Sequence, residues 1–463
     1  MFSSDTYQKR RAALRETMSS GAAVFLGHRD SPFNYAANCY PFRQDSSFLY
    51  FFGLNEPDWA AILDFDEGRE YLFGNDTTMD DIIWMGEQPS VATKAASVGI
   101  NESFPCATLP DILGKIRQSG RAIHFLPPYR GETKLELFKL LGIPPDEQKE
   151  KASESLIRAV VRLRSVKEAQ EIAQIEQAIE TTCQMHTCVM RRARAGITEQ
   201  ELTDAIENIA RQNGGTISFP VILSINGQIL HNHCHGNTLR NGRLLLTDAG
   251  AETAMGYAGD ITRTIPVSGQ FDERQRAVYE IVLQANRKVA EICRPEIPFL
   301  EVHLAAAHVI ADGLIRMGLM KGTAEDAVAA GAHVLFFPHG TGHMMGLDVH
   351  DMENLGEQYT GYDDDIQRSR QFGLSNLRMG RRLKEGFVVT DEPGIYFIPA
   401  LIDQWEGEKK LRDFIRYEAL KSFRDFGGIR IEDDLLITKK GCRVLGKAIP
   451  KTVEEIEKTM RHD

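Results

Sequence analysis

The sequence lacks the features that mark membrane-spanning, exported and nucleic-acid-binding proteins. No apolar run approaches the ~20 residues needed to cross a bilayer. Residues 1–16 are polar and charged, without the apolar core of a signal peptide. A formal net charge of -11 at pH 7 leaves no basic excess for general binding to nucleic acid or to an anionic membrane. We therefore expect a cytoplasmic protein that binds neither nucleic acid nor membranes.

Cysteines are few and show no pairing pattern. The chain has seven of them, an odd number, and no two form a Cys-x-x-Cys pair. A scattered set of this kind fits reduced thiols in a reducing compartment better than a disulfide framework.

Length and composition predict two folded domains. With 463 residues, 42% hydrophobic and 26% charged, the chain has ample material for packing but is too long for one ordinary core. The alternation of predicted strands and helices stops before Pro144-Pro145, and a polar run continues to Glu154. We predict a non-catalytic N-terminal domain over residues 1–155 and a catalytic domain over residues 156–463.

The first domain is expected to be a small α/β domain. Its predicted elements include a helix at 7–18, a buried strand at 21–27, and a hairpin of strands at 59–65 and 69–73. The aromatic stretch 40–53 contains a single basic residue, Arg43. It therefore fits core packing, or a wall over a neighbouring site, better than a platform for stacking bases.

The second domain is expected to group helices around an antiparallel sheet, class α+β. Apolar residues at helical spacing run from 156 to 194, as one helix or two in series, and a capping box at Thr198 to Glu201 begins another. Further helices are expected at 272–291 and 300–317, and strands at 221–225, 229–236, 243–248, 260–267, 386–390, 394–397 and 428–438. Asn226-Gly227, between the first two strands, is a hairpin marker.

A glycine-rich segment, residues 338–350, contains His339, His343 and His350. Imidazole both binds borderline metals and moves protons near neutral pH. A solvated loop would explain this segment if it stood alone. Its significance comes from four acids that lie at the ends of apolar strands, where charge is costly: Asp248, Asp260, Glu392 and Glu432.

Two of these acids are predicted to lie on adjacent antiparallel strands. Asp248 and Asp260 flank the turn 251–259, so their carboxylates are expected within a few ångströms of each other. Two such charges repel, and one pKa must rise unless a cation lies between them. A divalent metal removes this conflict.

The other two acids also occupy constrained positions. Arg430 and Glu432 alternate with isoleucines, so both polar side chains share one face of a strand. Glu392 precedes Pro393, which forces an extended or turned backbone at the end of a strand.

Four carboxylates and one histidine suffice for two divalent metals ~3.5–4 Å apart, as in dinuclear hydrolases. Such a pair generates hydroxide at neutral pH and stabilises the oxyanion that forms when an amide carbonyl is attacked. The oxygen-rich ligands favour manganese, with cobalt or zinc as alternatives.

At these residues the sequence resembles the aminopeptidase P and prolidase branch of the creatinase-like, pita-bread metallopeptidases. The resemblance covers nearly the whole chain. The stretch 40–46 resembles the family's N-terminal domain. Five metal-site motifs occur in the family's order, at residues 248–250, 259–264, 339–343, 392–396 and 428–433.

The resemblance implies a role for each site residue. The implied ligands of the two metals are Asp248, Asp260, His343, Glu392 and Glu432, with Asp260 and Glu432 bridging. Glu392 would also relay a proton to the leaving nitrogen. His339 and His350 would line the pocket and polarise the carbonyl or steady the intermediate, His231 would lie on the substrate side, and Arg430 would orient carboxylates or substrate.

The resemblance further implies a peptide substrate with proline second, a cleaved Xaa-Pro bond and a homodimer. Two features slightly favour an Xaa-Pro dipeptidase (prolidase) over an Xaa-Pro aminopeptidase acting on longer peptides. Arg378 falls where prolidases bind the dipeptide's carboxylate, although a surface arginine fits almost as well. The insertion 399–426 is also more like that of prolidases.

Two other interpretations stay open. A non-catalytic binding scaffold would share the fold, but such relatives usually lose ligands, and all five positions here hold competent groups. Creatinase-type hydrolysis of a small C–N bond shares the fold but not normally the metals. The sequence assigns no role to Asp391, His233 or His235.

Overall fold

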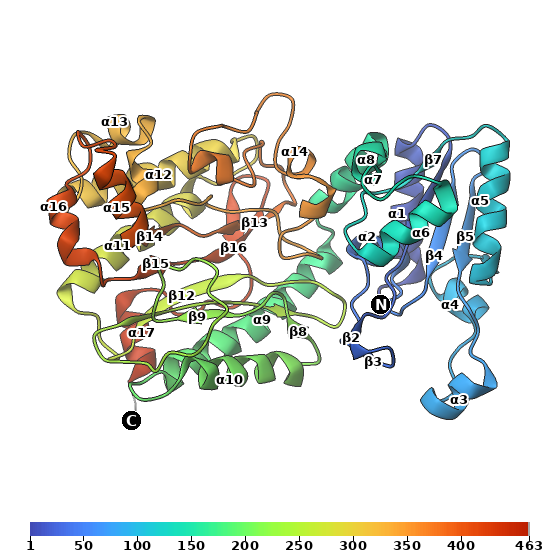
Figure 1. Cartoon of the computed structure of the whole chain (residues 1–463), viewed down its shortest axis with the longest axis horizontal. Helices are drawn as coiled ribbons and strands as arrows, with labels where there is room; N and C mark the ends of the chain where they lie inside the picture. The colour runs from blue at the N-terminus through green and yellow to red at the C-terminus, as the bar shows by residue number, and fades with distance from the viewer. Residues whose placement is uncertain (462–463) are drawn as a thin grey trace. The chain divides into compact units, whose positions relative to one another are not determined.

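The computed structural model describes residues 1–461 (Figure 1). The chain divides into two compact units, which we describe separately. The first comprises residues 1–164 together with 353–359, and the second comprises residues 165–352 and the chain from Thr360 onward. The compact units separate after Arg164. The domain boundary after residue 155 stays a prediction.

The first unit contains a five-stranded sheet in the order β6-β5-β4-β1-β7. Its strands are β1 (Ala22–Leu26), β4 (Ala60–Asp64), β5 (Arg69–Phe73), β6 (Glu102–Phe104) and β7 (Ile123–His124), and a small separate hairpin joins β2 (Pro32–Tyr35) to β3 (Asn38–Cys39). β1, β4 and β5 pair antiparallel, whereas the edge strands β6 and β7 pair parallel. The predicted hairpin 59–73 is confirmed.

The helices of this unit are α1 (Ser4–Thr17), α2 (Ser46–Phe52), α3 (Met79–Met85), α4 (Val91–Ser97), α5 (Leu109–Gln118), α6 (Gly131–Leu141), α7 (Gln148–Lys151) and α8 (Glu154–Ser165). Apolar residues of β1, β4, α5 and α6 form one buried core. The aromatic stretch ends in α2, all of whose residues are buried, and Asp45 caps this helix by accepting a hydrogen bond from the Phe48 amide.

The second unit carries long helices and short antiparallel strands. Its helices are α9 (Ala169–Arg192), α10 (Glu199–Gln212), α11 (Glu273–Ile292), α12 (Phe299–Arg316), α13 (Ala324–Ala329), α15 (Pro399–Gly407), α16 (Tyr417–Leu420) and α17 (Val453–Met460); α14 (Glu357–Thr360) begins in the first unit. The pattern over 156–194 is thus two helices, α8 and α9, and the Thr198 capping box is present. In the described residues no helix is both long and apolar enough to cross a membrane.

The strands of the second unit lie between two helical layers. They are β8 (Thr216–Ile217), β9 (Ile222–Ser224), β10 (Leu244–Ala249), β11 (Ala251–Glu252), β12 (Ile261–Pro266), β13 (Val388–Asp391), β14 (Gly394–Tyr396), β15 (Gly428–Arg430), β16 (Asp433–Ile437) and β17 (Cys442–Val444). α9, α10 and α17 lie on one side of the strands, and α11 and α12 on the other (Figure 1). They form small antiparallel sheets, in the orders β12-β10-β9, β11-β8, β13-β16-β17 and β14-β15, so the predicted antiparallel strands flanked by helices are present.

A long hairpin in this sheet is interrupted on both arms. β13 pairs with β16 and β14 pairs with β15, both antiparallel. Glu392-Pro393 separates β13 from β14, and Ile431-Glu432 separates β15 from β16. The predicted single strand 428–438 is therefore two strands. The interruption releases Glu392 and Glu432 from the regular ladder at the same level of the sheet, since the Ile431 amide donates to the Pro393 carbonyl.

One predicted hairpin is wrong. Residues 229–236 form no strand, and β9 pairs with β10 instead, with Ser224 opposite Leu246. The six-residue apolar strand β10 suits the buried sheet, whereas the His-Asn-His-Cys-His sequence would bring polar groups into it. Asn226-Gly227 still makes a turn, closed by a hydrogen bond from the Ile229 amide to the Asn226 carbonyl.

Gly250, which joins β10 to β11, sits where a side chain cannot fit. A Cβ there would lie 1.8 Å from the Gly259 carbonyl oxygen and 2.6 Å from the Ser218 hydroxyl. We expect Gly250→Ala to lower the free energy of unfolding by about 2 kcal/mol, because the backbone before Asp260 must move. Urea unfolding checks this. Gly236→Ala, where a Cβ meets nothing within 4 Å, is the control, and equal stability of both variants would contradict the expectation.

Candidate metal centre

The site is built where strands of the second unit end or break. Asp248 lies on β10 and Asp260 immediately precedes β12. The two strands pair antiparallel with Asp248 opposite Thr262. The adjacency predicted for the two aspartates is therefore confirmed, and both side chains are buried.

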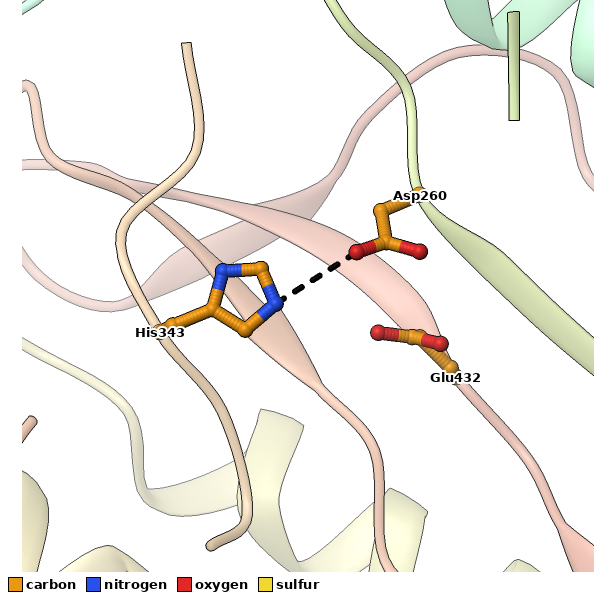
Figure 2. A group of neighbouring side chains, drawn as sticks. All are labelled: Asp260, His343 and Glu432. Atoms are coloured by element: carbon orange, nitrogen blue, oxygen red, sulfur yellow. Dashed lines mark ion pairs between the residues drawn. The ribbon is translucent and has the colours of Figure 1, made fainter. Parts of the chain in front are cut away.

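Three side chains converge closely enough to share one metal ion. Ligand atoms of Asp260, His343 and Glu432 all lie within 4.8 Å of one another. In Figure 2 the His343 ring and the two carboxylates face a common space, from the loop before β12, the 338–350 segment and the break before β16. His343 Nε2 is 3.4 Å from an Asp260 carboxylate oxygen.

Hydrogen bonding orients the His343 ring for coordination. Its Nδ1 lies 3.0 Å from the Met344 carbonyl, which can only accept, so Nδ1 carries the proton. Nε2 therefore points at Asp260 and at Glu392, whose oxygen is 3.7 Å away. A histidine held through one nitrogen by a carbonyl, with the other directed at carboxylates, has the arrangement of a metal ligand.

Glu392 completes the acidic cluster beside His343. Its amide donates to the Thr341 carbonyl at 2.8 Å, and its side chain accepts from the Thr390 hydroxyl at 3.4 Å. Its second oxygen lies 3.7 Å from His339 Nδ1. Glu432 accepts a shorter hydrogen bond, 2.6 Å, from the Thr262 hydroxyl.

The hydrogen bonding of these residues also indicates that they fit a divalent metal, and this evidence does not depend on the family resemblance. Asp248 Oδ1 and Asp260 Oδ1 are buried and have no hydrogen-bond donor in the structure. A buried carboxylate oxygen without a partner costs about 1–3 kcal/mol or more. Oxygen ligands with one imidazole suit a divalent cation of the manganese, cobalt or zinc type, so a cation among these atoms satisfies the orphaned oxygens.

The pKa values show the same conflict between burial and charge. Burial raises the pKa of Asp260 to about 6 and the pKa of Glu392 to about 7, and the neighbouring Asp248 charge adds to both shifts. Burial, with Asp260 and Glu392, also raises the pKa of Glu432 well above its usual range. Burial alone would lower the pKa of His343, but Asp260 and Glu392 outweigh it and raise that pKa. Metal binding would displace these protons.

A hydrogen-bonded chain connects Asp248 to His339. Arg430 donates to Asp248 at 2.6 Å and to the Tyr396 hydroxyl at 2.7 Å. His339 donates from Nδ1 to the Gly340 carbonyl, so its Nε2 accepts from the Tyr396 hydroxyl at 2.8 Å. Burial and the Arg430 charge lower the pKa of His339 to about 3, which keeps its ring neutral.

Sequence reasoning missed the contributions of Tyr396 and Thr262. Thr262 donates to Glu432 and accepts from Arg430 at 3.0 Å. The alternation Asp260, Thr262, Thr264 on one face of a strand was the available signal for Thr262. Tyr396 lies in the motif 392–396, but nothing local in the sequence shows that its hydroxyl meets Arg430.

The remaining predicted residues lie around this cluster. The His350 ring packs edge-on against His343, with centroids 4.3 Å apart. His231 is exposed, and partial burial followed by the positive charges of Arg430 and Arg378 lowers its pKa. The positive charge of Arg378 therefore acts on His231.

Three residues without a predicted role have structural surroundings. Asp391 is buried and accepts a 3.1 Å hydrogen bond from Asn286. His235 contacts the Val221 carbonyl at 3.1 Å, and His233 is exposed. The predicted strand 229–236, in which alternation would have put His231, His233 and His235 on one face, does not form.

A buried set of carboxylates and one oriented imidazole, on a pita-bread fold, defines a metal-dependent hydrolase. Two family models match the chain: metallopeptidase family M24 over residues 173–439, and the aminopeptidase P N-terminal domain over residues 7–124. The chain belongs to metallopeptidase family M24, and the family resemblance inferred from its motifs is confirmed.

Its relatives include both types of proline-specific exopeptidase. The chain is 31% identical over 439 residues to an Xaa-Pro dipeptidase of Homo sapiens, covering 90% of this chain and 84% of that one. It is 30% identical over 473 residues to an Xaa-Pro aminopeptidase of Escherichia coli K12, covering 98% and 97%. Proline aminopeptidase P II from Yersinia pestis has a similar structure, with a TM-score of 0.82, 30% identity and 99% of each chain covered.

We expect metal-free Asp260→Asn to gain stability relative to the wild type as the pH rises from about 4 to about 7. The unfolded chain releases the Asp260 proton near the ordinary pKa of 3.8, whereas the folded protein holds it up to about 6. The folded wild type therefore loses about 2 kcal/mol over this window, and the variant does not. Urea unfolding in chelator at about pH 4.5 and 7.5 measures the difference.

Comparing variants is necessary because the buried neutral His339 titrates in the opposite direction. Its pKa of about 3 makes the folded state gain stability as the pH rises toward 6.5, and both proteins share this gain. Manganese should restore the wild type above the variant at high pH. A stability difference that does not change with pH would contradict the shifted pKa of Asp260.

Proposed function

We propose that the protein hydrolyses Xaa-Pro bonds at two divalent metal ions. The observation that carries the proposal is a complete acidic cluster with buried, unpartnered carboxylate oxygens, in a chain similar over most of its length to Xaa-Pro peptidases. A binding scaffold would have no reason to keep such a costly cluster.

The proposed ligands are Asp248, Asp260, His343, Glu392 and Glu432. On the family resemblance, Asp260 and Glu432 would be the ligands shared by both metals, and ligand atoms of these two residues and of His343 lie within 4.8 Å of one another. Bound there, two divalent ions supply hydroxide at neutral pH and stabilise negative charge on the substrate's carbonyl oxygen. Manganese is the metal we propose, since four of the five ligands are carboxylates.

Glu392 is proposed to carry the proton between the two halves of the reaction. Its side chain is 18% exposed, so the carboxylate can meet both a water molecule and the leaving proline nitrogen, and it would accept a proton from the first and release it to the second. His339 lies 3.7 Å away and stays neutral. It therefore does not compete as a base, and it can face the substrate without adding charge.

The substrate would be oriented by groups around the cluster. His350, whose ring packs on that of His343, would polarise the scissile carbonyl, and His231, which is near enough to feel the charges of Arg430 and Asp248, would contact the substrate. Arg430 keeps the Asp248 carboxylate in place through a 2.6 Å hydrogen bond. Its remaining donors reach Thr262 and Tyr396, so we assign Arg430 to orienting the site.

A dipeptide substrate is our first proposal. Arg378 is half-buried, and its charge lowers the pKa of His231. An arginine there supports a role in binding the carboxylate of a dipeptide, which would exclude longer chains. The insertion 399–426 folds as α15 and α16 in the catalytic unit.

Xaa-Pro aminopeptidase activity on longer peptides is the second candidate. Its support is that the Escherichia coli Xaa-Pro aminopeptidase covers 98% of this chain, against 90% for the human dipeptidase. Homodimer formation and a cytoplasmic location also stay predictions.

We expect Arg378→Ala to lower kcat/KM for Gly-Pro about 50-fold and to change turnover of a longer Xaa-Pro-Xaa peptide much less. The loss reflects one charge-assisted contact with the dipeptide's carboxylate. Steady-state kinetics on both substrates measure it. Arg382→Ala removes a neighbouring arginine that donates to the Glu296 carbonyl and is the control. Equal losses on the two substrates would contradict the assignment.

Chelation should abolish Xaa-Pro cleavage, and added manganese should restore it, because the nucleophile depends on the metals. Glu432→Gln should resist restoration, since the variant loses a bridging carboxylate. Peptide hydrolysis and bound manganese are measured on the same samples, with circular dichroism to show that the chelated protein stays folded. Cleavage that survives chelation would exclude the proposed mechanism.

A further inference from the structure

A fully buried ion pair lies behind the segment that carries His343 and His350. Lys167 Nζ is 2.7 Å from Asp351 Oδ2, and both side chains are only 1% exposed. Both residues belong to the second unit. We propose that this pair is a positioning device for His350, and so that Lys167 and Asp351 control the rate of the proposed reaction without touching substrate.

Asp351 closes the loop on which His350 lies. Its amide donates to the Met344 carbonyl at 2.8 Å, so residues 344–351 return to their starting point. The same carbonyl accepts from Nδ1 of His343 at 3.0 Å. One backbone oxygen therefore fixes both the ring of His343 and the end of the loop that follows it.

Lys167 is distant from this loop in the sequence, but its side chain reaches into the loop. It is anchored by its own amide, which donates to the Gly386 carbonyl at 2.8 Å. Its side chain passes Gly346, where a Cβ would lie 2.7 Å from Lys167 Cε and 2.8 Å from Asp351 Oδ2. Gly346 thus leaves the space that the ammonium group needs, and the loop is shaped around the ion pair.

The energetics favour a role in positioning over one in stability. Removing two charges from water is expensive, and a buried ion pair is often no more stable than two apolar side chains of similar size. A directional 2.7 Å contact does, however, select one loop conformation. His350 directly precedes Asp351, and its ring packs on His343 at 4.3 Å, so a shift of Asp351 moves His350 away from its place beside the proposed ligand.

The inference rests on the proposed function for its activity readout, but not for its structural one. The test compares the wild type, Lys167→Met/Asp351→Leu, His350→Ala and the combination of all three. We expect the paired variant to keep a urea midpoint near that of the wild type, whereas Lys167→Met alone lowers it. We also expect the paired variant to lose about 100-fold in kcat on an Xaa-Pro substrate, with a smaller change in KM.

A double-mutant cycle identifies the cause of the loss. If the ion pair acts through His350, the triple variant loses no more than His350→Ala alone. Losses that multiply, or a paired variant with kcat within about twofold of the wild type, would overturn the proposal. Arg443→Met, which removes an exposed pair with Glu176 in the same unit, is the control and should leave kcat unchanged.

A spectroscopic readout separates this proposal from the proposed function. In metal-free protein, the imidazole NMR signal of His350, assigned with His350→Ala, should shift in the paired variant. It should not shift in Arg443→Met. If the wild type fails to cleave any Xaa-Pro substrate, the proposed function fails, and the NMR comparison still decides the positioning role. Should the paired variant not fold, Asp351→Asn, which keeps the side chain's shape, takes its place in both measurements.

Discussion

The structure depends on concentrating negative charge in a largely buried space. Asp260, Glu392 and Glu432 are held so close in a buried space that their pKa values rise by burial and mutual repulsion. Arg430 offsets part of this charge through Asp248, but buried oxygens of Asp248 and Asp260 remain without donors. The fold maintains an arrangement that is unfavourable by itself and becomes favourable when cations occupy it.

The strand topology explains how such an arrangement can be rigid. Asp248 is fixed by the register of β10 with β12, and Asp260 stands at the start of β12. Glu392 and Glu432 lie where both arms of one hairpin break at the same level. The breaks free these side chains from the alternation of the pleat, while the paired strands on either side keep the backbone in place. The acids are thus held by the sheet, and only His343 comes from an irregular segment.

Local sequence pattern predicted much of this fold, but it could not predict which distant segments contact each other. Alternation and apolar runs identified the long helices of the second unit, the hairpin 59–73 of the first unit and the two aspartates on adjacent strands. The same reasoning failed at residues 229–236, because an Asn-Gly turn does not say which strand will lie beside β9. It also missed the contact of Tyr396 with Arg430 and the pairing of Lys167 with Asp351, since neither partner carries a local signal for the other. Such contacts are decided by packing between distant segments.

His339 and His343 belong to the same five-residue motif, but the packing around each ring gives the two histidines different properties. The pKa of His343 is raised, although burial opposes the shift, because its Nε2 faces Asp260 and Glu392. The pKa of His339 is lowered by burial and by the positive charge of Arg430, and its Nε2 accepts from Tyr396. His343 therefore attracts positive charge, as a metal ligand must, whereas His339 rejects it. A sequence motif alone does not distinguish these two rings; the direction that each Nε2 faces does.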